Sequence, residues 1–432
     1  MQFEEREFLP VILGADITAY SLARSFHEEY HIKSLVLSMS EGGYIANSDI
    51  IENRVFPGLE NKEVLIKHLI EVGEEFKGKK KLIVLGCGDW YVRALIESKK
   101  ELEPYYIVPY IDEELLNKIV LKDKFYEIFE ELGLDYPETY VYECGKENDL
   151  KFNFDYPVIA KPANSAMYHY AKFDGKKKVF SFDNEEQLRA MLEKLEGSSY
   201  DYKFLIQDKI PGDDTYMRVL TCYCDRNSKV RFAALGRTLL EDHTPTAIGN
   251  PVAIINEVNH EIVAAATKFL EHIGYVGFAN FDIKYDERDG KYKFFEINVR
   301  LGRSNFYVTG SGFNTVKWIV DDYIYNKLDD YTVADSVNLY TVVPKGVIMK
   351  YVPESDFKEL ARRLFKEGKV TYPLLYKADK NLKHNFYARA ALINQYRKYY
   401  PSKEDVFFKP ELKVGESFHI GGWINETVRC RD

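Results

Sequence analysis

The sequence lacks the features of membrane proteins and of dedicated nucleic-acid binders. No apolar run approaches the ~20 residues that a membrane-spanning helix needs. The formal net charge is -9, whereas a nucleic-acid binder needs a basic face that displaces counterions from phosphates. The opening MQFEEREFLP has neither the basic start nor the apolar core of a secretory signal. We therefore expect a soluble, cytoplasmic protein with no nucleic-acid partner and no transmembrane segment.

Cysteine is also scarce, with five residues in a chain of 432. Cys222 and Cys224 lie two positions apart in a predicted strand and so share a face, but two ligands do not make a zinc site. An odd number of cysteines without zinc spacing fits reduced thiols in a cytosolic protein.

The first hundred residues alternate predicted strands and helices, which indicates a parallel sheet with covering helices. Strands are predicted at Phe8–Leu13, Lys33–Met39 and Lys80–Leu85, with helices at Thr18–Tyr30 and Lys62–Phe76. The first strand is followed by Gly-Ala-Asp-Ile-Thr-Ala and lacks the GxGxxG pattern, so a dinucleotide site is poorly supported. Gly14 and Gly86–Gly88 stand where strands end, and either tight turns or a small-molecule edge explains them.

From about residue 112 strands and helices mix in a way that favours an α+β arrangement. We predict a Rossmann-like α/β domain at 1–111, a second domain at 112–335 and a C-terminal basic extension at 336–432. The extension is rich in Lys, Arg and Tyr. Its cluster Arg362, Arg363 and Lys366 suggests a surface for an anionic substrate or a membrane, and a solvated helical face is the alternative.

A predicted hairpin carries polar side chains that suit a cation better than a core. Its second strand, Tyr292–Val299, follows an Asp-Gly turn. Side chains alternate along a strand, so Glu296, Asn298 and Arg300 project from one side. Asp282 on the first strand can face Glu296, and two close carboxylates repel unless a cation lies between them. The oxygen atoms of these side chains suit Mg²⁺ bound next to a phosphate, and Arg300 can stabilise that phosphate. The alternative is a solvated strand face with salt bridges.

This hairpin resembles the metal-binding hairpin of the ATP-grasp superfamily, and upstream residues follow that family's order. Lys124 near the start of a helix resembles its first ATP lysine, and Lys161 at the end of a buried strand resembles its second. The resemblance implies ATP as co-substrate with Mg²⁺, or alternatively Mn²⁺. The implied metal ligands are Asp282, Glu296 and Asn298; the implied ATP-binding residues are Lys124, Lys161, Ser165, Gln207, Asp208, Lys209, Ile210 and Asp214; the implied catalytic residues are Arg300 and Arg237.

The stretch after the second lysine departs from the family pattern. Many ATP-grasp relatives carry a glycine-rich loop there, which folds over the phosphates. This chain has no glycine between Pro162 and Gly175. A lid must therefore use Asn164, Ser165 or nearby backbone amides.

Three longer segments resemble the D-aspartate ligases, a family of carboxylate–amine ligases in bacterial cell-wall precursor synthesis. They are FLPVILGADITAYSLARSFHEEY, KPANSAMYHYAKFDGKKKVF and TYPLLYKADKNLKHNFY. The resemblance implies that ATP activates an amino-acid carboxylate as an acyl phosphate, which an amine then attacks. It implies D-aspartate as donor and the lysine side chain of a UDP-muramoyl pentapeptide as acceptor. Ligation of another amino acid or a dipeptide is an alternative, as is a nucleotide-binding regulatory protein without turnover. The oligomeric state is open, with a homodimer as one candidate.

Overall fold

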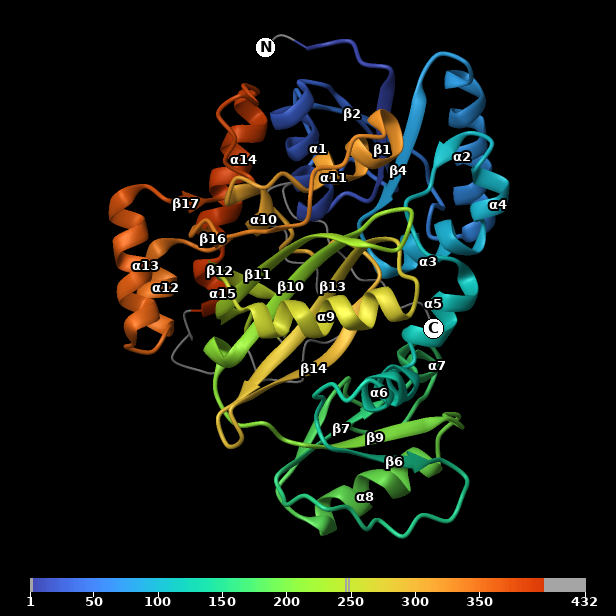
Figure 1. The fold of residues 1–432 in the computed structure, drawn as a ribbon, viewed down its shortest axis with the longest axis vertical. Coiled ribbons are helices and arrows are strands. Elements are labelled where there is room, and N and C mark those ends of the chain that lie inside the picture. The colour runs from blue at the N-terminus through green and yellow to red at the C-terminus, as the bar shows by residue number, and fades with distance from the viewer. Residues whose placement is uncertain (1–2, 245–246, 248, 400–432) are drawn as a thin grey trace.

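The strands of the chain form three sheets, and Figure 1 shows the N-terminal sheet at the top, the sheet built mainly from residues 217–298 in the middle and the small sheet of residues 139–208 at the bottom. The computed structural model describes residues 3–244, 247 and 249–399. A parallel sheet with helices comes first, and two largely antiparallel sheets follow. The predicted combination of α/β and α+β architecture is therefore confirmed.

The N-terminal sheet has the strand order β3-β2-β1-β4-β5, and its strands run parallel. β1 lies in the middle and is buried on both faces, which explains its continuous apolar sequence. The chain leaves β1 towards β2 on one side and later enters β4 on the other, so the ends of β1 and β4 form a switch point where open α/β sheets bind ligands. The elements are β1 (Phe8–Leu13), α1 (Ile17–Tyr30), β2 (Ser34–Ser38), β3 (Ile51–Val55), α2 (Lys62–Phe76), β4 (Lys81–Gly86), α3 (Asp89–Glu97), α4 (Lys99–Leu102) and β5 (Tyr106–Ile107).

A small antiparallel sheet of order β6-β9-β7-β8 has a hydrophobic core of its own, which includes Val158, Leu188 and Phe204. Two helices lead into it, and Asn184 caps the helix that covers it by accepting a hydrogen bond from the Gln187 amide. The elements are α5 (Glu113–Ile119), α6 (Lys122–Glu131), β6 (Thr139–Glu143), β7 (Val158–Pro162), α7 (Ser165–His169), β8 (Phe180–Phe182), α8 (Glu185–Glu196) and β9 (Lys203–Asp208).

The central sheet has the order β14-β13-β10-β11-β12-β16-β17, and β15 pairs with β11. Helix α9 covers one face, where the Phe269 ring lies 6.0 Å from that of Phe281. Helix α10 lies on the other face, where the Tyr307 hydroxyl donates to the Ala234 carbonyl at 2.6 Å. The elements are β10 (Met217–Cys224), β11 (Val230–Glu241), β12 (Pro251–Glu257), α9 (His260–His272), β13 (Gly277–Asp286), β14 (Lys291–Asn298), α10 (Phe306–Gly310), α11 (Thr315–Val320), a π-helical turn (Asp321–Tyr325) and β15 (Thr332–Val333).

The chain beyond residue 336 is built onto both larger sheets. β16 extends the central sheet by pairing with β12, and β17 pairs with β16. Figure 1 shows the helices that follow beside the central and N-terminal sheets. The domain boundaries stay a prediction. The elements are β16 (Leu339–Thr341), α12 (Lys345–Tyr351), α13 (Asp356–Glu367), β17 (Val370–Thr371), α14 (Leu382–Asn394) and α15 (Tyr396–Tyr399).

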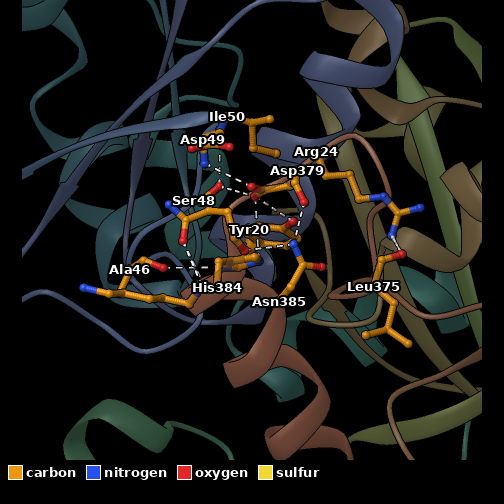
Figure 2. A network of polar contacts seen from close by, with 12 residues as sticks. Tyr20, Arg24, Ala46, Ser48, Asp49, Ile50, Leu375, Asp379, His384 and Asn385 are labelled. Atoms are coloured by element: carbon orange, nitrogen blue, oxygen red, sulfur yellow. Dashed lines mark hydrogen bonds and ion pairs between the residues drawn. The ribbon is translucent and has the colours of Figure 1, made fainter. Parts of the chain in front are cut away.

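Asp379 ties this C-terminal segment to the N-terminal sheet, as Figure 2 shows. Its Oδ2 accepts hydrogen bonds from the Tyr20 hydroxyl at 3.1 Å and from the Ser48 hydroxyl at 2.6 Å. Its Oδ1 accepts one from the Asp49 amide at 3.0 Å. The His384 ring stacks on Tyr20, with 4.6 Å between the centroids. Because Asp379 is fully buried, these donors replace the water that its carboxylate has lost.

The basic cluster at 362–366 is largely neutralised by neighbouring acids. Arg362 contacts Glu354 at 3.0 Å and also pairs with Glu359. Arg363 lies 3.8 Å from Glu367. These ion pairs weaken the hypothesis of a basic surface at this cluster and favour the solvated helical face.

Two expectations concern membranes and cysteines. Within the described ranges, no helix is long and apolar enough to cross a membrane. The cysteines there are free thiols, with Cys222 and Cys224 buried in β10. Cys430 lies outside the described residues.

Candidate functional site

Two carboxylates face each other on adjacent strands of the central sheet. The register pairs Asp282 of β13 with Glu296 of β14, and Asn280 with Asn298. Directly paired side chains share a face, so these residues project together. The Asn298 amide nitrogen donates to Asp282 Oδ2 at 3.3 Å. Burial, and then the charge of Glu296, raise the pKa of Asp282 above its usual range.

Two lysines approach this acid pair from the smaller sheet and the helix before it. Lys122 Nζ lies 2.6 Å from Glu296 Oε2, and its positive charge holds the pKa of Glu296 well below its usual range. Lys161, in β7, has its Nζ 5.4 Å from the ring centroid of Phe295. Burial, and then the charge of Lys122, lower the pKa of Lys161 to about 7. Two cations so close together, next to acids, fit a site that receives phosphate oxygens.

The structure places Lys124, a predicted ATP-binding residue, away from the acid pair. The Lys124 ammonium is exposed and pairs with Glu127 on its own helix at 2.7 Å. Lys122 lies two residues before Lys124 and shares a helix face with Tyr126. The Tyr126 hydroxyl donates a hydrogen bond to the carbonyl of Phe295 at 2.8 Å. Because residues two apart lie on opposite sides of a helix, only one of the two lysines can face β14. Lys122 therefore occupies the place that the sequence assigned to Lys124.

Arg300 joins the acid pair to the N-terminal sheet. Its Nε donates to Asp89 Oδ1 at 2.6 Å, and its Nη2 to Asp89 Oδ2 at 3.1 Å. The same guanidinium moderates the raised pKa of Asp282. Asp89 begins α3, directly after Gly86–Gly88 at the end of β4. The carboxyl edge of the N-terminal sheet thus meets Arg300, for which the sequence predicted a catalytic role.

The predicted adenine linker follows β9. Gln207 is buried, and its Nε2 donates to Thr139 Oγ1 at 2.8 Å. The Ile210 carbonyl accepts a hydrogen bond from Lys284 Nζ at 3.0 Å. Asp214 Oδ2 accepts one from the Glu241 amide at 2.9 Å. The side chains of Asp208 and Lys209, which lie between Gln207 and Ile210, contact other parts of the protein.

Those neighbours engage other parts of the protein. Asp208 pairs with Arg288, and Lys209 Nζ donates to Ser181 Oγ at 3.1 Å. The Asp208 backbone amide donates to the Glu138 carbonyl at 3.0 Å. Ser165 begins α7, but its side chain lies outside the described part of the structure.

The structure places Arg237 on the opposite face of the central sheet from the acid pair, so this prediction of a catalytic residue is not supported. Arg237 pairs with Arg218 in the register, and Arg218 pairs with Ile283. Ile283 follows Asp282 in β13, so the two side chains project to opposite faces. Arg237 instead holds Glu257 at 2.8 Å and lies 3.8 Å over the ring of Phe357.

Three further residues near the acid pair escaped the sequence reasoning. The charge of Lys178 acts on both Lys161 and Glu296. Lys284 reaches the linker, as described above. Burial, and then the charge of Asp214, raise the pKa of Glu241 to about 7. Lys284 has a weak sequence signal, since it lies two positions from Asp282 and shares its face.

The oxygen atoms of the acid pair fit a magnesium ion. Among the described residues, no three His, Cys, Asp or Glu side chains form a metal-binding group. Asp282, Glu296 and Asn298 supply two carboxylates and one amide oxygen. Mg²⁺ is commonly held by one or two carboxylates and completes its octahedron with phosphates and water. A cation between the two carboxylates would offset the effect of the Glu296 charge on the pKa of Asp282.

Comparison with known proteins agrees with this geometry. The family model "Carbamoyl-phosphate synthase L chain, ATP binding domain" matches residues 247–317, which include the hairpin. A protein named D-aspartate ligase, from Enterococcus faecium (strain Aus0004), is 37% identical over 421 residues. That alignment covers 93% of this chain and 99% of the relative.

Solved structures share the fold at low sequence identity. The biotin carboxylase domain of Hydrogenobacter thermophilus 2-oxoglutarate carboxylase, in complex with MgADP, superposes with a TM-score of 0.58 at 14% identity, covering 77% of this chain and 73% of that one. The L-amino acid ligase from Bacillus licheniformis superposes with a TM-score of 0.52 at 16% identity, covering 74% of this chain and 75% of that one. At such identities the likeness concerns the fold alone.

Proposed function

The chain belongs to the D-aspartate ligase family of ATP-grasp enzymes, and on this premise we propose that it couples D-aspartate to an amine at the expense of ATP. The relative's name supports D-aspartate as the donor. As acceptor we propose the lysine side chain of a UDP-muramoyl pentapeptide, which agrees with the resemblance seen in the sequence.

The single observation that carries this proposal is the acid pair of Asp282 and Glu296 between Lys122 and Arg300. Lys122 is 2.6 Å from Glu296, and the charge of Arg300 reaches Asp282. Phosphoryl transfer needs alignment and neutralisation of charge more than covalent help from the protein. A purely regulatory nucleotide binder has no need for an arginine beyond the metal ligands.

The proposed reaction has two steps. An oxygen of the donor carboxylate attacks the γ-phosphorus of ATP, the bond from that phosphorus to the ADP oxygen breaks, and an acyl phosphate forms. The amine then attacks the acyl carbon, loses a proton, and inorganic phosphate leaves with the original carboxylate oxygen. Lys122 and Lys161 hold phosphate oxygens, and Arg300 stabilises charge on the acyl phosphate.

The nucleotide base lies against the linker after β9 in this proposal. Gln207 and the backbone from Asp208 to Ile210 read the adenine edge, and Asp214 receives the ribose. Asp282, Glu296 and Asn298 would hold Mg²⁺, which when bound neutralises the β- and γ-phosphates.

The test is release of phosphate from ATP with single D- and L-amino acids, with and without UDP-muramoyl pentapeptide. The proposal predicts release that requires both D-aspartate and the acceptor. Glu296→Gln keeps the shape of the side chain but removes its charge, so this variant should fold normally and release no phosphate. Turnover with L-amino acids or dipeptides alone would favour a different ligase, and no turnover with any donor would favour a regulatory protein.

A further inference from the structure

Helix α14 carries large apolar side chains on the side that faces solvent. Leu382 is 85% exposed, Phe386 67% and Ile393 64%. Phe386 and Ile393 are rotated from Leu382 by only about 40° and about 20° around a helix of 3.6 residues per turn, so the three side chains form one stripe. Figure 1 shows α14 on the outside of the molecule. These three residues are called the α14 stripe below.

The opposite side of α14 is packed against the N-terminal part of the chain. The His384 ring stacks on Tyr20 of α1, with 4.6 Å between the centroids, and Ala388 is fully buried. The Asn385 side chain donates to the carbonyl of Asp379 at 2.7 Å, which fixes the start of the helix (Figure 2). A helix that is apolar on all sides is usually covered on all sides. Packing of the inner side therefore leaves the apolar outer side unexplained.

The chain around α14 is basic, although the protein as a whole is acidic. No acidic residue lies between Asp379 and Glu404, whereas the formal net charge of the chain is -9. Lys383, Arg389 and Arg397 are exposed, and within the described part of the chain no acid pairs with them. Arg389 lies among the apolar residues of the stripe, and its alkyl stem can pack with them while its guanidinium reaches outwards. The outer side of α14 thus combines apolar side chains with positive charge that no neighbour neutralises.

A second copy of this chain is a poor match for this face. Helix α14 has 13 residues, so it is about 20 Å long, and one side of it offers roughly 200 Å². A stable protein interface buries about 800 Å² on each partner. A symmetric contact through α14 would also bring the basic residues of the two copies together, which is unfavourable.

We propose that the α14 stripe docks this protein on the surface of an anionic lipid bilayer. An exposed helix with Leu, Phe and Ile beside Lys and Arg can lie in the plane of the interface, with its apolar side chains among the upper acyl segments. Its cations then meet the anionic headgroups, which a negatively charged protein would otherwise avoid. Among the described residues no helix is long and apolar enough to cross a membrane, so the contact is peripheral and reversible. The inference goes beyond the proposed function and does not depend on it.

The first test is sedimentation of the full-length protein with lipid vesicles. The protein should sediment with phosphatidylcholine vesicles that contain one third phosphatidylglycerol, and should stay in solution with pure phosphatidylcholine. Raising the salt concentration to about 0.5 M should weaken binding at least tenfold, because salt screens the headgroup charge. Absence of binding to the anionic vesicles would overturn the proposal.

The second test removes the stripe. Leu382→Ser, Phe386→Ser and Ile393→Ser in one variant should weaken binding to the anionic vesicles at least tenfold. The control variant replaces three exposed valines outside α14 with serine: Val141, Val258 and Val337. Because all six side chains are exposed, both variants should unfold at the temperature of the wild type, and the control should bind vesicles like the wild type. Vesicle binding that survives the loss of the stripe would contradict the proposal.

The third test separates local charge from net charge. Lys383→Gln, Arg389→Gln and Arg397→Gln together should weaken vesicle binding at least tenfold. The matched control removes the same charge from the cluster at 362–366 of α13, most of which acids already neutralise, and should change binding less than twofold. Equal losses in both variants would show attraction by net charge alone and would refute docking through α14. A dimer in sedimentation velocity that the serine variant abolishes, without vesicle binding by the wild type, would instead assign the stripe to a contact between copies and overturn the proposal.

Discussion

The ammonium of Lys122 and the carboxylate of Glu296 meet at 2.6 Å, although they are 174 residues apart in sequence and belong to different layers of the fold. The contact joins the start of α6 to the central hairpin. It shows that the acid pair already attracts a cation from a neighbouring element. With Mg²⁺ held by Glu296, the Lys122 ammonium would be available for a phosphate oxygen.

Lys122→Ala should weaken ATP binding about ten- to hundredfold, because one charge-assisted contact with the phosphates is lost. Lys124→Ala removes the same side chain from the exposed side of the same helix and should leave affinity unchanged. Titration calorimetry with MgATP measures both. If Lys124→Ala loses the affinity and Lys122→Ala does not, the assignment of Lys122 is wrong.

Arg300→Lys should reduce turnover more than ATP affinity. Lysine keeps the positive charge but lacks the planar fork that can hold two oxygens at once. Steady-state kinetics with saturating ATP, together with calorimetry, separate the two effects. The control is Asp89→Asn, which leaves the guanidinium in place and should cost less than Arg300→Lys. A loss confined to ATP binding would assign Arg300 to the nucleotide.

Asp379→Ala should lower the free energy of unfolding by about 3 kcal/mol, because buried hydroxyl and amide donors lose their acceptor. The donors are Tyr20, Ser48 and the Asp49 amide. Ser48→Ala removes one donor and should cost about 1 kcal/mol. Urea unfolding compares both with Asp174→Ala, a fully exposed aspartate that should change stability by less than about 0.5 kcal/mol. Similar values for Asp379→Ala and Asp174→Ala would show that the network carries no stability.

The spacing of apolar residues, together with the residues that end helices and strands, predicted much of the fold. The strand at Phe8–Leu13 and the helix at Lys62–Phe76 have the predicted bounds, because a buried parallel strand and an amphipathic helix leave clear patterns. β3 was missed, since as an edge strand (Ile51–Val55) it has few apolar residues. β12 was missed although its apolar run at Pro251–Glu257 was sufficient to predict it.

In the candidate site, too, relations between residues close in sequence could be predicted, and relations across distant segments could not. Alternation in one hairpin was enough to place Asp282 opposite Glu296, since that relation is local. The choice between Lys122 and Lys124 depends on which face of α6 packs against β14, which no local pattern reveals. The face on which Arg237 lies could not be predicted, because it is fixed by pairing across three strands, β11, β10 and β13.

The most direct test of the central claim follows oxygen from the donor carboxylate to phosphate. D-Aspartate labelled with ¹⁸O in its side-chain carboxylate is turned over with ATP and UDP-muramoyl pentapeptide, and the released phosphate is analysed by mass spectrometry. The acyl-phosphate account predicts one ¹⁸O atom in each phosphate released. The same experiment with label only in the α-carboxylate should give unlabelled phosphate if the side-chain carboxylate is the one activated. Phosphate without ¹⁸O from both labelled substrates, while the amide product accumulates, would contradict activation of the carboxylate by ATP.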